Sequence, residues 1–264
     1  MEILLYYLLI GSLAGFFAGL LGIGGGLVFV PALVVLFSAQ GFSETVIMPL
    51  ALGTSLAAIV FTSLSSAAAH HAKRAVNWQA LRGMAPGVTV GAFFSAAFAA
   101  HVPSAWLKLA FALYAALAAT QLLCDLKPLT PRKLPGRAGL MAAGCVVGSL
   151  SGMAGAGGAV TCIPLLAWWN VPARSAIGTA AAIGMPISMA GTAGYIFGGW
   201  PLESLPAASL GFVYLPALFA MVAASMLSAP VGARVSHALP VPLLQKLLAT
   251  VLYAIAVRML LGSA

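Results

Sequence analysis

The feature that most constrains the fold of this chain is a glycine-rich stretch that occurs twice. The first copy covers residues 11–31 and the second covers residues 144–164, an offset of 133 residues, and seven glycines and prolines coincide between them. Each copy is an apolar run with a small residue at every fourth position, then a cluster of glycines, then a second apolar run that contains a proline. We call the clusters knot 1 (residues 22–26) and knot 2 (residues 155–159).

The amino-acid composition predicts a membrane protein. Of the 264 residues, 62% are hydrophobic and only 6% are charged, which is too few charges to cover the surface of a soluble domain of this size. Apolar runs of 17 or more residues recur along the chain, and such runs are typical of transmembrane helices. We therefore predict an all-α polytopic membrane protein.

Ten apolar segments are expected, five in each half of the chain. They cover residues 3–21, 26–38, 47–69, 80–100, 105–124, 138–154, 159–169, 175–197, 207–228 and 241–261. The second segment of each half is too short to span a bilayer, because a span needs about 20 residues. The predicted organisation is an N-terminal transmembrane repeat over residues 1–124, a cytoplasmic linker over residues 125–137 and a C-terminal transmembrane repeat over residues 138–264.

The distribution of Lys and Arg favours one of two topologies. If each knotted pair of segments counts as one crossing, the halves are parallel, and the loop 198–206, which holds Glu203 and no basic residue, becomes cytoplasmic. If each knotted pair returns to the side on which it entered, every loop obeys the positive-inside rule and the halves become inverted repeats. We favour the second arrangement, in which short broken or re-entrant helices lie at the knots.

The knots are the first candidates for a binding site. Glycines let the backbone leave helical geometry and approach a ligand closely. The helix after each knot would then direct free N–H groups and its positive dipole end at an anion, and such broken helices mark transporter binding sites. The alternative is tight helix packing, which we prefer for the four-residue stripes before the knots. The candidate glycines are Gly22, Gly24, Gly25, Gly26, Gly155, Gly157 and Gly158.

Four hydroxyl residues are further candidates for the substrate site. Thr54, Ser55 and Thr179 lie at matching points of the third segment of each half, and Thr161 follows knot 2. Their hydroxyls can donate to an oxygen of an anion. They can equally bond the carbonyl one turn back in their own helix, and the sequence leaves both roles open.

These motifs resemble those of the sulfite/organosulfonate exporter family, the TauE/SafE type of membrane permease. The resemblance rests on LLGIGGGLVFVPAL (residues 20–33), on its echo MAGAGGAVTCIPLL (residues 153–166), and on the pair ALGTSL and AIGTAA. It implies transport of a small sulfur-containing or carboxylate anion across the bacterial inner membrane by a multi-pass protein that is not an enzyme. One departure is Ala159, which stands where the first copy has Gly26.

The acidic residues bear on how transport is driven. All four lie at segment ends or in loops, so the sequence offers no carboxylate at membrane depth to carry a proton. A monoanion that leaves the cell down a negative-inside potential gains about 2.3 kcal/mol per 100 mV. We therefore expect an exporter of sulfite or sulfonates that is driven mainly by membrane potential.

The expected partners are a small anionic substrate and the lipid bilayer, and a homodimer is left open. Nucleic acid is not expected, because the net charge of +8 is carried by loops and segment ends. The three cysteines and four histidines are dispersed, so we expect no metal, cofactor or catalytic residue. A permease for another small carboxylate anion is the alternative function, followed by a membrane-embedded redox or metal-handling protein.

Overall fold

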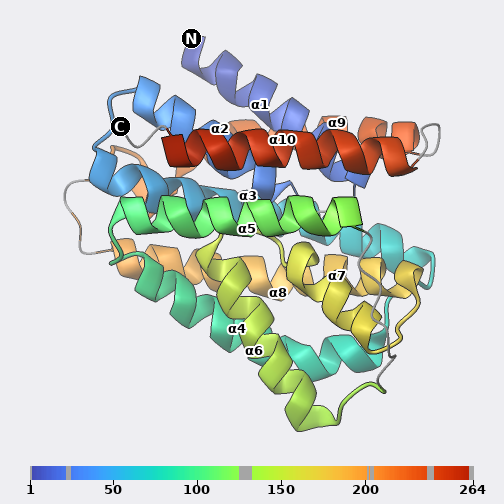
Figure 1. Ribbon diagram of the computed structural model, residues 1–264. Coiled ribbons are helices and arrows are strands. Elements are labelled where there is room, and N and C mark those ends of the chain that lie inside the picture. The colour runs from blue at the N-terminus through green and yellow to red at the C-terminus, as the bar shows by residue number, and fades with distance from the viewer. Residues whose placement is uncertain are drawn as a thin grey trace.

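Helices make up nearly all of the part of the chain that the computed structural model describes (Figure 1). This part comprises residues 2–21, 25–124, 133–200, 202, 205–236 and 241–261. It holds ten helices and one antiparallel hairpin of two short strands. The prediction of an all-α architecture is confirmed.

The helices of each half follow the same order of long and short elements. Those of the first half are α1 (Glu2–Leu21), α2 (Gly26–Ala39), α3 (Glu44–Ala72), α4 (Trp78–Ala99) and α5 (Ser104–Cys124). Those of the second half are α6 (Arg137–Met153), α7 (Ala159–Trp168), α8 (Ala173–Gly199), α9 (Leu215–Ser236) and α10 (Val241–Leu261), with the strands β1 (Ser209–Leu210) and β2 (Val213–Tyr214) between α8 and α9.

Three helices, α3, α5 and α8, are long and apolar enough to cross a membrane when only the described residues are considered. The second helix of each half is much shorter, with 14 residues in α2 and 10 in α7. Because a helix rises about 1.5 Å per residue, α7 reaches only about half-way through a hydrocarbon core of about 30 Å.

Nine of the ten expected segments coincide with helices to within three residues at either end, and the ninth segment is the exception. It was expected over residues 207–228, but α9 begins at Leu215. The preceding residues form the strand pair, which is entered through Ala208 and turned at Gly211, both with positive φ. Pro216 lies in the first turn of α9, where a missing N–H breaks no helical hydrogen bond.

The two halves are interleaved, so that most helices find their main partner in the other half. Helix α1 packs along α9, and α6 packs along α4 at the opposite end of the molecule (Figure 1). Helix α3 packs against α8, and α5 packs against α10. Helices α1 to α5 correspond in order to α6 to α10. If each helix is exchanged for its counterpart, the four pairs named above are obtained again.

The glycine stripes of α1 and α6 allow two of these contacts. A Cβ on Gly11 would lie 2.7 Å from the Cα of Met221, and one on Gly144 would lie 2.4 Å from the carbonyl oxygen of Met84. The next glycine of each stripe, four residues on, meets the next turn of the same partner, so both pairs run parallel. Close packing accounts for these stripes, as the four-residue spacing predicts.

The directions of α6 and α8 show that the chain turns back between them. Helix α4 runs parallel to α6, and it also runs parallel to α8, because Gly194 lies against Phe93 while Gly198 lies against Ala97. Helices α6 and α8 therefore point the same way. Residues 154–172, which include α7, must return toward the side from which α6 started.

The central pair, α3 and α8, runs antiparallel. Gly191 of α8 faces Leu56 of α3, and Gly184 of α8 faces Ser63 further along α3. The middle of α3 is the most enclosed part of the fold, since its side chains between Ile47 and Ile59 are buried. The knots lie against this buried centre.

Candidate functional site

In both knots, the residue just before the new helix is a glycine in the left-handed region of backbone space. Gly25 has φ 77° and is the N-cap of α2, and Gly158 has φ 79° and is the N-cap of α7. Residues with a Cβ rarely adopt this conformation. The knots therefore break what would otherwise be continuous helices, and they start a new short helix at the same place in each half.

The two knots touch at the centre of the molecule. A Cβ on Gly26 would lie 2.8 Å from the carbonyl oxygen of Gly155. The hydroxyl of Ser55, on α3, donates a hydrogen bond of 3.0 Å to that same oxygen. All three residues are buried. The structure thus brings together predicted site residues from both halves of the chain.

The remaining candidate glycines of knot 2 lie in the same buried region. Gly155 also has a positive φ, of 61°, and the carbonyl of Gly157 faces Gly184 on α8. Ala159 takes the place of Gly26 as the first residue of its helix and is 4% exposed. In knot 1, the candidates Gly22 and Gly24 lie outside the described residues.

The first turn of α7 presents more unpaired donors than the first turn of α2. In α2, the N–H groups of Val28 and Phe29 both donate to the carbonyl of Gly25 at 3.0 Å. In α7, the first such bond comes from Cys162 to Gly158 at 2.8 Å. Within the part of the chain that is described, the N–H groups of the three residues before Cys162 make no hydrogen bond. Such groups and the helix dipole favour an anion.

Two hydroxyls lie beside this free helix end. Thr161 donates to the carbonyl of Gly158 at 3.2 Å, and the hydroxyls of Ser151 and Thr161 are 3.4 Å apart. Ser151 is fully buried and comes from α6. Both contacts are long for hydroxyl hydrogen bonds, so both hydrogen bonds are weak.

Thr54 and Thr179 occupy equivalent places in a contact that occurs twice. The N–H of Tyr214, just before α9, donates to the hydroxyl oxygen of Thr54 at 3.0 Å. The N–H of Asn77, just before α4, donates to that of Thr179 at 2.8 Å. The hydroxyl of Thr179 in turn donates to the carbonyl of Ser175, one turn back in α8, at 2.6 Å. Each threonine thereby holds the start of a helix from the other half.

The glycine before each threonine makes this contact possible. A Cβ on Gly53 would lie 2.2 Å from the carbonyl oxygen of Phe212, and one on Gly178 would lie 2.3 Å from that of Ala75. In each case the carbonyl belongs to the residue two places before the N–H donor. We call these paired contacts the Gly–Thr contacts. They give both threonines a structural role, because each hydroxyl oxygen accepts a hydrogen bond from a backbone N–H group of the other half.

Sequence analysis did not single out Tyr114, which the structure places at knot 2. This α5 residue is 6% exposed. Its hydroxyl is close enough to those of Ser151 and Thr161 to interact with them, but it makes no hydrogen bond of ordinary geometry with a described residue. A single tyrosine in an apolar run belongs to no motif and has no counterpart in the repeat. Only the three-dimensional packing of α5 against α6 and α7 could reveal it.

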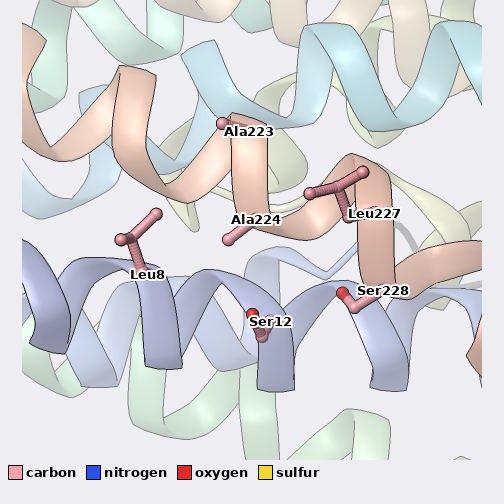
Figure 2. Close-up of a pocket in the computed structure, with 6 residues that line it drawn as sticks. All are labelled: Leu8, Ser12, Ala223, Ala224, Leu227 and Ser228. Atoms are coloured by element: carbon pink, nitrogen blue, oxygen red, sulfur yellow. The ribbon is translucent and has the colours of Figure 1, made fainter.

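The two cavities described here lie away from knot 2. One, of about 390 Å³, lies between α1 and α9; Figure 2 shows Leu8 and Ser12 on one side and Ala223, Ala224, Leu227 and Ser228 on the other. The other, of about 560 Å³, lies beside α2 and α10. Its lining is mostly apolar and also includes Lys108 and Arg258. Lys108 pairs with Glu44 at 3.1 Å. The second cavity borders Val28 and Pro31 and so lies on the outer side of the helix that follows knot 1.

In the described part of the chain, no group of three or more His, Cys, Asp or Glu side chains is placed to hold a metal ion. The buried polar side chains there are all serines and threonines, apart from the tyrosine hydroxyls. The candidate site around the knots is therefore built from backbone groups and neutral hydroxyls.

Comparison with known proteins identifies the family. The sequence pattern of the family described as sulfite exporter TauE/SafE matches residues 7–259. The chain belongs to the TauE/SafE family. No solved structure matches this TauE/SafE chain.

Relatives of this TauE/SafE chain are named as probable membrane transporter proteins. One, from Haemophilus influenzae, is 36% identical over 260 residues, which cover 98% of each chain. YunE of Bacillus subtilis is 29% identical over 72% of this chain and 77% of its own length. A third, from Methanocaldococcus jannaschii, is 25% identical over 96% of this chain and 94% of its own length. The family and these relatives make this chain a membrane transporter.

Proposed function

We propose that this transporter is a secondary permease that exports a small sulfur-containing anion, such as sulfite or a sulfonate, across the bacterial inner membrane. The observation that carries the proposal is the meeting of the two knots at the buried centre. There, two helices begin after left-handed glycines, with free N–H groups at the start of α7. The name of the family supports a sulfur anion as the substrate.

The knots suit an anion because of how a helix begins. The first N–H groups of a helix have no partner within it, and the aligned peptide dipoles place a partial positive charge at this end. In a low-dielectric centre these groups can hold an anion without a charged side chain. Discontinuous helices of this kind hold anionic substrate groups in other secondary transporters.

The arrangement of the halves supports a mechanism of alternating access. We propose that the halves are inverted repeats, as the antiparallel course of α3 and α8 and the return of the chain between α6 and α8 suggest. In such transporters, rocking of one repeat against the other opens a fixed central site first to one side and then to the other. The Gly–Thr contacts lie at equivalent places of both halves, which is expected of two structural repeats.

The absence of acidic residues from the membrane-spanning sequence supports transport driven by voltage. The only acids are Glu2, Glu44, Asp125 and Glu203, at segment ends or in loops. Proton-coupled transporters usually place a carboxylate at membrane depth. A monoanion moving outward instead gains about 2.3 kcal/mol per 100 mV from the membrane potential.

Efflux from proteoliposomes tests this proposal. Purified protein is reconstituted, vesicles are loaded with sulfite or methanesulfonate, and a potassium diffusion potential, negative inside, is set with valinomycin. We expect efflux to rise with the potential, and to be the same whether the buffers on the two sides set a pH gradient or hold both sides at one pH. Protein-free vesicles are the control. Efflux that stops when the pH gradient is removed at constant voltage would contradict voltage-driven export.

A carboxylate permease is the second candidate, because a helix N-terminus binds a carboxylate by the same N–H groups. The same vesicles loaded with acetate separate the two functions. Faster efflux of acetate than of either sulfur anion would replace the proposed substrate while leaving the mechanism in place.

A further inference from the structure

We propose that the anion is bound at knot 2 only, by the hydroxyls of Tyr114, Ser151 and Thr161 together with the free N–H groups that begin α7. We call these three residues the hydroxyl cluster. The inference rests on the function proposed above and names the residues that would recognise its substrate. It also assigns to knot 1 a structural role.

The hydroxyl of Tyr114 is the observation that points to a ligand. It is enclosed by protein and makes no hydrogen bond of ordinary geometry with a described residue, although the hydroxyls of Ser151 and Thr161 are close enough to interact with it. Buried polar groups are almost always hydrogen-bonded, so one with only weak contacts requires a reason. A ligand that accepts its proton would supply a well-placed partner beside those two hydroxyls.

The other members of the hydroxyl cluster can turn toward the same ligand. Ser151 and Thr161 are joined by a contact of 3.4 Å, and Thr161 reaches the carbonyl of Gly158 at 3.2 Å. A hydroxyl rotates freely to suit its partner, so both protons can be redirected without moving the backbone. Thr161 itself lies in the first turn of α7, beside the free N–H groups.

Knot 1 also has a left-handed glycine just before a short helix, but its equivalent positions lack these hydroxyls. The offset of 133 residues places Ala18 and Val28 at the positions equivalent to Ser151 and Thr161. The offset of 138 residues that aligns Lys108 with Lys246 places Leu252 opposite Tyr114. The pattern of burial supports this second alignment, since three aligned pairs are buried. They are Phe111 with Ala249, Tyr114 with Leu252, and Ala118 with Ala256.

The number of donors in the hydroxyl cluster fits an oxyanion with three oxygens. Three hydroxyls and the N–H groups of α7 converge from three helices, so each oxygen of a sulfite or sulfonate group can accept at least one hydrogen bond. A carboxylate has about four lone-pair sites, all in one plane, so it can accept from fewer of the three hydroxyls and the α7 N–H groups than a pyramidal group with three oxygens. A buried donor left unpaired in this way discriminates between ligands. The cluster therefore favours a sulfur oxyanion over a carboxylate.

Substitutions that remove only an oxygen test the proposal. The full-length protein is purified in detergent, and binding of sulfite and of methanesulfonate is measured by calorimetry for wild type, Tyr114→Phe and Thr161→Val. We expect each variant to bind both anions at least tenfold more weakly. The matched control is Tyr195→Phe, because this α8 tyrosine is also fully buried with an unpaired hydroxyl but packs near Gly53. It should bind as wild type does.

Melting temperature without ligand separates binding from folding. Since the hydroxyl of Tyr114 has only poorly placed contacts with Ser151 and Thr161, its removal should change the melting temperature of the ligand-free protein very little. Thr161→Val keeps shape and volume and is the second variant if Tyr114→Phe does not fold. Unchanged affinity in either folded variant would overturn the assignment of the site while leaving the proposed function standing. A wild-type protein that binds neither anion would overturn both.

Discussion

Knot 1 and knot 2 are alike at the glycine before each short helix and differ in the side chains around it. Both contain a left-handed glycine at the N-cap of a short helix, with φ of 77° and 79°. Among the described residues, the three hydroxyls of the cluster and a first helical turn with three unpaired N–H groups are found at knot 2. If the anion is bound as proposed, the fold needs the broken helix twice, whereas recognition of the substrate needs it once.

The Gly–Thr contacts provide the opposite case, because they match in both backbone and side chain. Thr54 and Thr179 each accept a backbone N–H from the other half, and the glycine before each lets a carbonyl oxygen come close. Contacts that hold the halves together are thus the same in both, while the proposed ligand contacts are found in one.

The largest effect is expected where the halves match. Gly53→Ala and Gly178→Ala would each place a Cβ within 2.3 Å of a backbone carbonyl oxygen. Overpacking typically costs about 1–3 kcal/mol, and a clash with backbone falls at the upper end of this range. We expect both variants to lose most of their folded protein in size-exclusion chromatography. Gly136→Ala is the control, since open space surrounds that position. A severe loss in one variant and none in the other would show that the two contacts are not equivalent.

A medium effect is expected at the left-handed glycines of the knots. Gly25→Ala and Gly158→Ala should each lower the free energy of unfolding by about 1–2 kcal/mol, because alanine is strained in this conformation. Thermal melting checks this equal loss of stability. Sulfite binding should then separate the variants, since only Gly158→Ala disturbs the helix start that holds the ligand. Weaker binding in Gly25→Ala as well would extend the site to knot 1.

The smallest effect is expected when knot 1 is given one hydroxyl of knot 2. Val28→Thr keeps the shape of the side chain at the position equivalent to Thr161, and in a helix the new hydroxyl can bond a carbonyl one turn back. We expect stability to change by less than about 1 kcal/mol and sulfite affinity to stay within about twofold, measured by calorimetry. A several-fold gain in affinity would mean that knot 1 already binds the anion.

The sequence predicted those parts of the fold that depend on local chemistry. The repeat of glycines located both breaks, and apolar runs located nine helices, because a glycine cluster and a run of about 20 apolar residues have few alternatives in a membrane. The start of α9 was misplaced because residues 207–214 are as apolar as a helix, and only their packing beside Gly199 of α8 shows the strand pair.

The sequence could not predict contacts between distant elements. The glycine stripe of α1 predicts close packing but does not show that the partner is α9. The sequence around Thr54 likewise does not predict its hydrogen bond with the N–H of Tyr214. Tyr114 is the clearest case, since its importance depends on the two hydroxyls that other helices bring to it. The candidate residues of knot 2 were predicted from the repeat, and the tyrosine was not.

The parallel packing of α1 on α9 has a consequence for how the protein is made. Helix α1 is synthesised before α9, yet the surface that covers the glycine stripe of α1 is on α9. Until α9 has been synthesised, the stripe of α1 can contact only lipids or the insertion machinery. The whole chain, rather than either half, is therefore the unit that assembles in the membrane.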